Sequence, residues 1–124
     1  MAPVHSYQDL VVWQKAMTLA AVCYRKTRSF PRSEVFGLTA QIRRAAASIP
    51  ANIAEGYGRE HTGSYIHHLR ISQGSLKELE THVLLAQTVE LMDSEDAQQV
   101  LDASEEVGKL LRSLIRALQD REAK

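Results

Sequence analysis

The sequence predicts an all-α protein, built as a single up-down-up-down antiparallel four-helix bundle. In four successive stretches the apolar residues recur three and four positions apart, which is the spacing of one face of a helix. Short polar connections separate these stretches, so consecutive helices are expected to lie side by side and antiparallel. Only 6% of the residues are aromatic, and no alternating strand pattern or internal repeat competes with the helical one.

Length and composition indicate one globular domain, expected to span residues 1–124. The chain has 124 residues, of which 44% are hydrophobic and 24% are charged. No run of about 18 apolar residues is present, so no membrane segment is expected. The N-terminus lacks the basic and apolar regions of a signal peptide, and the single cysteine, Cys23, has no partner for an internal disulfide. These features predict a cytoplasmic protein.

The first helix is expected over residues 7–28, opened by a capping box from Ser6 to Asp9. One apolar stripe is expected to form its core seam: Leu10, Trp13, Met17, Ala20 and Tyr24. A second apolar stripe lies beside the first: Val12, Ala16, Leu19 and Cys23. The helix is expected to end before Phe30-Pro31.

The second helix is expected over residues 34–57, with Ser33 as its N-cap. Its core seam is predicted to be Leu38, Ile42, Ala45, Ile49 and Ile53. Pro50 lies in its interior and removes one backbone hydrogen bond, so we expect a kink near residues 46–50. Gly56 and Gly58 are expected to end the helix, as glycines do at helix C-termini.

The third and fourth helices are expected over residues 63–91 and 95–120, the latter with Ser94 as its N-cap. The third has a regular heptad seam: Tyr65, Leu69, Ser72, Leu76, Leu79, Val83 and Ala86. Gly74 within it costs helix stability, so the stretch Ser72-Gln-Gly-Ser75 predicts a close approach to the small residues of the second helix.

The fourth helix, like the first, has two apolar stripes. Its predicted seam is Val100, Ala103, Val107, Leu110, Leu114 and Ala117, flanked by Leu101, Leu111, Ile115 and Leu118. The doubled stripes of the first and last helices exceed what one bundle must bury. They therefore predict an interface between subunits.

Charge is divided unevenly along a chain whose formal net charge is zero. Residues 1–70 hold nine Lys or Arg and four Asp or Glu, whereas residues 71–124 hold six and eleven. The basic half could offer a surface for phosphates. Alternatively, the two halves attract each other within one bundle or between subunits.

Several runs of residues are similar to a known family. They are Tyr7-Gln-Asp-Leu-Val-Val-Trp-Gln14, Phe30-Pro-Arg-Ser-Glu34, Gly37-Leu38, Gln41-Ile-Arg-Arg44, Ser48-Ile-Pro-Ala-Asn-Ile-Ala-Glu-Gly56, Arg59, Gly74-Ser-Leu76 and Glu78-Leu-Glu80. With them the chain resembles the four-helix bundle proteins encoded by intervening sequences in bacterial 23S ribosomal RNA genes. That family in turn resembles the accessory variability determinant of diversity-generating retroelements, which forms a five-membered ring.

The resemblance implies a ring-like homo-oligomer, a homopentamer, that binds RNA or DNA. The retroelement proteins are strongly basic, whereas this chain is neutral. Because phosphate neutralisation is the main source of non-specific affinity for nucleic acid, this difference argues against strong non-specific binding.

Two sets of residues are candidates for function. The nucleic-acid-binding candidates are basic: Arg25, Lys26, Arg28, Arg32, Arg43 and Arg44. Cations of this kind are also common on an ordinary solvated surface. Asn52, Glu55 and Arg59 share one helix face, where they could form a ligand site or, as we favour, a structural network that fixes subunit register.

Catalytic and metal chemistry are not expected. His67 and His68 are adjacent and diverge on a helix, and the paired Glu-x-x-His motifs of di-iron bundles do not occur. Cys23 lies in an apolar stripe, where it is expected to be a small core residue rather than a nucleophile. We therefore predict a non-catalytic accessory protein without cofactor or metal that associates with nucleic acid, RNA in particular. The alternative is an oligomeric scaffold or adaptor that binds a protein partner.

Overall fold

The structure, a computed structural model, describes residues 3–123 and contains four α-helices, two short 3-10 helices and, within this range, no strand. In chain order they are η1 (Tyr7–Asp9), α1 (Val11–Lys26), η2 (Arg32–Glu34), α2 (Leu38–Tyr57), α3 (Thr62–Thr88) and α4 (Ser94–Glu122). The all-α class and the four helices are confirmed. Of the predicted domain 1–124, residues 1, 2 and 124 lie outside the described range.

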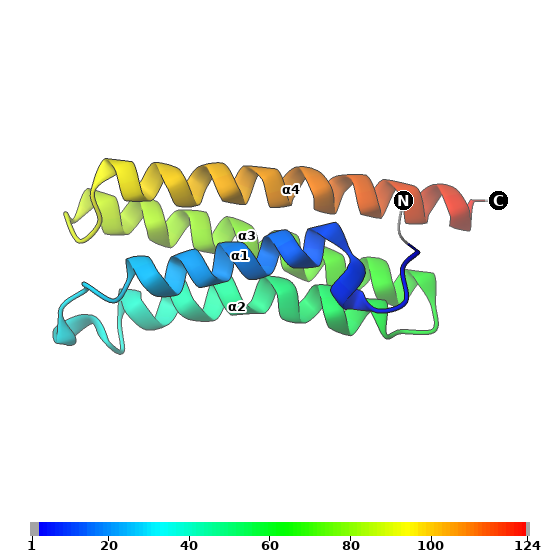
Figure 1. Cartoon of the computed structure of the whole chain (residues 1–124), viewed down its shortest axis with the longest axis horizontal. Helices are drawn as coiled ribbons and strands as arrows, with labels where there is room; N and C mark the ends of the chain where they lie inside the picture. Colours follow the sequence, from blue (N-terminus) through cyan, green and yellow to red (C-terminus); the bar gives the residue numbers. More distant parts are fainter. Residues whose placement is uncertain (1–2, 124) are drawn as a thin grey trace.

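The four helices run up, down, up and down (Figure 1). The α1–α2 and α3–α4 connections lie at one end of the bundle, and the α2–α3 connection lies at the other. Each helix packs on its neighbour in sequence, and α1 also packs on α4. This closed arrangement follows from the short connections, which leave consecutive helices antiparallel.

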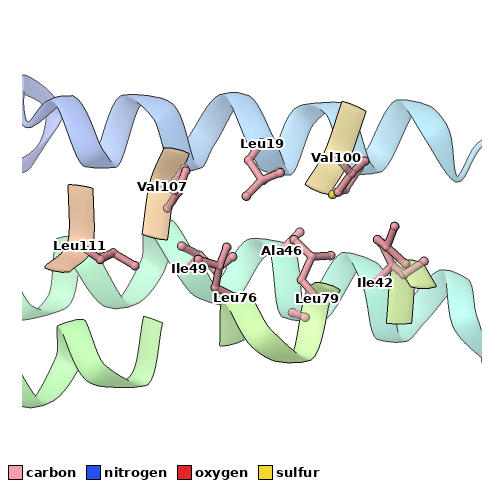
Figure 2. Close-up of a cluster of buried hydrophobic side chains, with 14 of the residues drawn as sticks. Leu19, Ile42, Ala46, Ile49, Leu76, Leu79, Val100, Val107 and Leu111 are labelled. Carbon is pink, nitrogen blue, oxygen red and sulfur yellow. The ribbon is translucent and has the colours of Figure 1, made fainter. Parts of the chain in front are cut away.

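The core is a continuous apolar cluster along the bundle axis. Figure 2 shows part of it: Leu19 from α1; Ile42, Ala46 and Ile49 from α2; Leu76 and Leu79 from α3; and Val100, Val107 and Leu111 from α4. The predicted seams of α2 and α3 supply most of the core contributed by those two helices. Burial of these side chains drives folding, at about 1.5–3 kcal/mol for each fully buried large aliphatic residue.

The predicted core seam of α1 is only partly correct, because the neighbouring stripe supplies most of the core. Of the predicted seam, Ala20 is buried and Leu10 and Trp13 pack against the core. Val12, Ala16, Leu19 and Cys23 are buried, whereas Met17 and Tyr24 of the predicted seam are 44% and 43% exposed. Both stripes are apolar and have helical spacing, so periodicity alone does not distinguish them.

The two stripes of α4 are likewise partly exchanged. Val100 and Val107 of the predicted seam are buried. In the C-terminal part of α4, however, the core residues are the flanking Leu111, Ile115 and Leu118. Leu110 and Leu114 are half-buried and pack against the edge of the core, and Ala117 is exposed. Both stripes of α4 are thus largely covered within the subunit, whereas Met17 and Tyr24 of the predicted seam of α1 are exposed.

The start of α2 differs from the prediction. Ser33 does not cap it, because residues 32–34 form η2 and α2 begins only at Leu38. The N-cap residue is Gly37, and the Oε1 of Glu34 accepts the amide of the first helical residue, Leu38, at 3.1 Å. The helix then continues through Pro50 to Tyr57. The kink expected at Pro50 stays a prediction.

Three other boundaries are corrected. The Ser6–Asp9 capping box exists but caps η1, and α1 starts at Val11. The third helix ends at Thr88, and Glu90 in the following turn has a left-handed backbone with φ 66°. Asp93 rather than Ser94 caps α4, because its carboxylate accepts the Asp96 amide at 2.8 Å.

The glycines are partly as expected. Gly58 is the C-cap of α2, with a negative φ of −76°, whereas Gly56 lies inside the helix, where an added Cβ would be 2.9 Å from the Cβ of His68. Gly74 itself is exposed, and an added Cβ there would meet nothing. The predicted approach of the Ser72-Gln-Gly-Ser75 stretch to α2 is nevertheless confirmed, because Ser72 Oγ donates to the Ile49 carbonyl at 2.9 Å and the Ser48 and Ser75 hydroxyls are 2.8 Å apart.

Candidate functional site

The six basic candidates lie towards one end of the bundle, in the C-terminal part of α1, the following connection and the N-terminal half of α2 (Figure 1). Two of them, Lys26 and Arg43, have hydrogen-bond or ion-pair partners within the subunit. Lys26 Nζ pairs with Asp96 Oδ1 of α4 at 2.8 Å. Arg43 Nε donates to Thr27 Oγ1 at 2.9 Å, Arg43 Nη2 donates to the Tyr24 carbonyl at 3.3 Å, and its guanidinium stacks 4.8 Å from the Tyr24 ring centre. Arg43 thus ties α2 to the end of α1.

The other four candidates are Arg25, Arg28, Arg32 and Arg44. All four are exposed, and within residues 3–123 their side chains form no hydrogen bond or ion pair. A guanidinium with unoccupied donors can bind phosphate in a bidentate manner. These four side chains are therefore the part of the predicted set that remains available to a ligand.

The same connection holds an apolar pair that the sequence reasoning did not single out. Val35 and Phe36 lie between η2 and α2 and are 51% and 93% exposed. Val35 continues the spacing of the Leu38–Ile42 seam, so periodicity does not mark this pair as exposed. The available signal was their position, between a charged turn and a glycine.

The uneven charge of the chain is partly neutralised inside the bundle. Two ion pairs join the basic and acidic halves across α1 and α4: Lys26 with Asp96, and Lys15 with Glu106 at 3.2 Å. The reading in which the halves attract each other within one bundle therefore explains part of the asymmetry. It does not involve the four exposed arginines.

The second candidate set divides into an inner and an outer part. Asn52 faces α3: its Nδ2 donates to the Ser48 carbonyl at 2.9 Å, and the Nδ1–H of His68 donates to its Oδ1 at 3.2 Å. The Ser48 hydroxyl also bonds to that of Ser75 at 2.8 Å, and Ser72 Oγ donates to the Ile49 carbonyl at 2.9 Å. The sequence indicated that Ser72 and Ser75 approach the second helix, but it did not indicate His68, because only the fold brings that ring opposite Asn52.

Glu55 and Arg59 form the outer part. They pair with each other at 2.8 Å on the exposed side of α2, and Glu55 Oε2 is 4.0 Å from His68 Nδ1. His68 thus lies between the inner part and the outer part. The inner hydrogen bonds hold α2 and α3 in one register, which is a structural role.

An open apolar groove of about 470 Å³ lies between α1 and α2. Its lining is almost entirely apolar: Tyr7, Trp13, Met17, Ala20, Ala21, Tyr24, Ala47, Pro50, Ala51 and Ala54. The stripe of α1 that was predicted to be core forms one wall, and the alanines of α2 keep the floor shallow. A surface of this kind is typical of a protein–protein contact.

A second groove, of about 590 Å³, lies between α3 and α4. Its rim is charged, with Lys77 and Glu80 on α3 and Glu105 and Arg112 on α4. Ser104 belongs to its lining, and the Ser104 hydroxyl is buried without a hydrogen-bond partner in the described part of the chain. The mixed charge of the rim favours neither an anion nor a cation.

Cys23 and Tyr65 are two core-side groups whose pKa values are raised. Burial raises the pKa of the Cys23 thiol to about 12, so this thiol is not activated. Burial, with a smaller contribution from Tyr57, also raises the pKa of Tyr65 to about 12. Among residues 3–123 no three His, Cys, Asp or Glu side chains gather as a metal site, and none of the described helices is long and apolar enough to cross a membrane.

Comparisons with known proteins agree with this architecture. The model of a family described as 23S rRNA-intervening sequence protein matches residues 8–113. One similar solved structure is a protein of unknown function from the S23 ribosomal protein family of Bacteroides thetaiotaomicron VPI-5482. It shares 28% identity with a TM-score of 0.76, over 85% of this chain and 98% of that chain. No curated protein matches the chain.

Proposed function

We propose that this chain, which belongs to the 23S rRNA-intervening sequence protein family, is a non-catalytic, homo-oligomeric accessory protein that associates with RNA. One observation carries the proposal: four exposed arginines without internal partners lie at one end of the bundle. The family's connection with ribosomal RNA genes favours RNA over DNA.

Assembly would compensate for the neutral overall charge. This end of a single subunit offers four available guanidinium groups, and a ring, five-membered by resemblance, would repeat them in every copy. Each phosphate neutralised on a single strand adds about 0.7 to the slope of log affinity against log salt. Repetition would thus give a neutral subunit useful affinity without a strongly basic sequence.

The α1–α2 groove supports the assembly itself. Its apolar lining has no covering element within the described chain, and it lies on a different part of α2 from the Ser48–Asn52 network. Burying apolar surface there would contribute about 25 cal/mol per Å². We propose that a second copy of the chain covers this groove.

A charge-removal series tests the RNA proposal. The triple variant Arg25→Gln/Arg28→Gln/Arg44→Gln should reduce the magnitude of the salt slope by about 2, because three phosphate contacts are lost. Arg43 is left unchanged because its bonds to Thr27 and Tyr24 support the fold. Binding of a labelled RNA is measured by fluorescence anisotropy at several salt concentrations.

The matched control is Arg70→Gln/Arg112→Gln/Arg116→Gln, which removes the same charge from exposed positions on α3 and α4. This control should keep the wild-type slope. Equal losses in the two triple variants would contradict a localised site, and absence of binding by the wild-type protein would overturn the proposal.

The alternative function is a scaffold or adaptor that binds a protein partner. It is favoured by the same apolar groove between α1 and α2. Salt distinguishes the two functions, because apolar contacts are nearly indifferent to ionic strength whereas phosphate contacts weaken steeply. A salt-insensitive partner retained through the groove would support the adaptor.

A further inference from the structure

The tip of the α1–α2 connection places an aromatic ring in solvent. Phe36 is 93% exposed, the highest value among the exposed large hydrophobic side chains, and Val35 beside it is 51% exposed. Leaving a phenylalanine in water forgoes about 1.5–3 kcal/mol of burial free energy. A subunit gains no stability from this position.

Backbone hydrogen bonds hold the tip in one conformation. The Val35 amide donates to the Arg32 carbonyl at 3.1 Å, and the Gly37 amide donates to the Glu34 carbonyl at 2.9 Å. The Glu34 side chain caps Leu38, and a Cβ at position 37 would be 2.6 Å from that carboxylate. Phe36 is thus presented outward on an ordered turn, which reduces the entropy lost when it binds.

Three arginines lie before and after this turn in the sequence. Arg32 belongs to η2, four residues before Phe36; Arg28 follows the end of α1; and Arg44 lies in the second turn of α2. The one carboxylate of the connection, Glu34, is half-buried and bonded to Leu38. The tip therefore combines an exposed ring with unpaired positive charge.

Resting on the proposed association with RNA, we propose that Phe36 is a stacking platform for an unpaired base of single-stranded RNA, with Arg28, Arg32 and Arg44 contacting the neighbouring phosphates. A base inside a duplex already has both faces stacked, so an exposed ring can stack only on an unpaired one. Phosphate-bearing single strands match this surface because the guanidinium groups near Phe36 are unpaired, whereas the one carboxylate of the connection, Glu34, is bonded to Leu38.

The test compares variants of the full chain by fluorescence anisotropy. The probe is a fluorescein-labelled oligouridine of about 12 nucleotides, within the usual size of single-strand sites, alongside an RNA duplex of equal length. Phe36→Ala should bind the single strand roughly 5- to 100-fold more weakly, the range that loss of one base stack gives. Its salt slope should be unchanged, because no phosphate contact is removed.

Two further substitutions separate stacking from simple apolar contact. Phe36→Trp should retain single-strand affinity because it keeps an aromatic face, whereas Phe36→Leu should lose it as Phe36→Ala does. The control is Val11→Ala, which truncates an apolar side chain that is 55% exposed at the start of α1, towards the other end of the bundle. This control should bind as the wild type does.

The outcomes are distinct. Undiminished single-strand binding by Phe36→Ala overturns the stacking site and leaves the proposed RNA association intact. No RNA binding by the wild-type protein removes both. Full affinity in Phe36→Leu, or a smaller assembly mass in Phe36→Ala by native mass spectrometry, would show that the side chain makes apolar or subunit contacts instead.

Discussion

Two faces of α2 come from one short run of residues, yet one face is apolar and the other is polar. Towards the open groove beside α1, the run presents Pro50, Ala51 and Ala54. Towards α3 it presents Ser48 and Asn52, whose side chains are hydrogen-bonded to each other and to α3. One helix thus carries a polar face whose hydrogen bonds are made within the subunit and, a few residues away, an uncovered apolar surface.

The physical reason is the different cost of leaving each face alone. Part-buried polar groups need partners, because an unsatisfied one costs about 1–3 kcal/mol. The face towards α3 must therefore be completed within the subunit. Small apolar side chains in water cost much less, so the groove can remain open until another chain covers it.

The largest effect on subunit stability is expected where α2 and α3 approach most closely. Gly56→Ala should lower the free energy of unfolding by about 2 kcal/mol, because the new Cβ would be 2.9 Å from the His68 Cβ and 3.1 Å from the Tyr65 carbonyl oxygen. Gly74→Ala is the matched control and should raise it by about 0.5–1 kcal/mol, since that site is open and helical. Urea denaturation measures both, and similar changes in the two variants would contradict the close approach.

A smaller loss is expected from the polar seam. Asn52→Ala removes the partner of His68 Nδ1 and a donor to Ser48, and should lower the free energy of unfolding by about 1–2 kcal/mol. Ala51→Ser, one residue earlier on the groove side, should change it by less than about 0.5 kcal/mol. If the two variants unfold at the same urea concentration, the seam contributes nothing beyond helix formation.

The smallest effect on the subunit, with the largest effect on assembly, is expected in the groove. Met17→Glu places a charge on a side chain that is already 44% exposed, so subunit unfolding should change by less than about 0.5 kcal/mol. A carboxylate buried against a second copy would be unpaired, so the assembly should dissociate. Native mass spectrometry at matched concentrations checks this against Ser113→Glu on the exposed side of α4, and an unchanged mass in Met17→Glu would place the subunit contact elsewhere.

Much of the fold was predictable because helix formation depends on residues close together in the sequence. The four helices, the seams of α2 and α3, and the capping box at Ser6 follow from short-range spacing and side-chain chemistry. The start of α2 was misplaced because residues 32–34 form η2 and the helix begins only after Gly37. The start of α4 was misplaced because two adjacent residues, Asp93 and Ser94, both have capping side chains. Which of the two caps the helix depends on the preceding turn.

The candidate surfaces were less predictable. The basic set was recognisable from composition, but its division into bonded and available members was not. Arg43 and Arg44 are adjacent and chemically identical, yet only Arg43 reaches the end of α1. The α3 partner of Asn52 is His68, which lies 16 residues away, and no local pattern connects the two.

The sequence by itself determined the helical class, the number of helices and the set of apolar residues from which a core could be drawn, because periodicity and composition act over a few residues. Only the tertiary structure decided which apolar stripe of α1 is buried, which arginines are available, and that Phe36 is presented to solvent. Those outcomes depend on what lies opposite each side chain. Two stripes of equal hydrophobicity on one helix become core and surface only when neighbouring helices cover one of them.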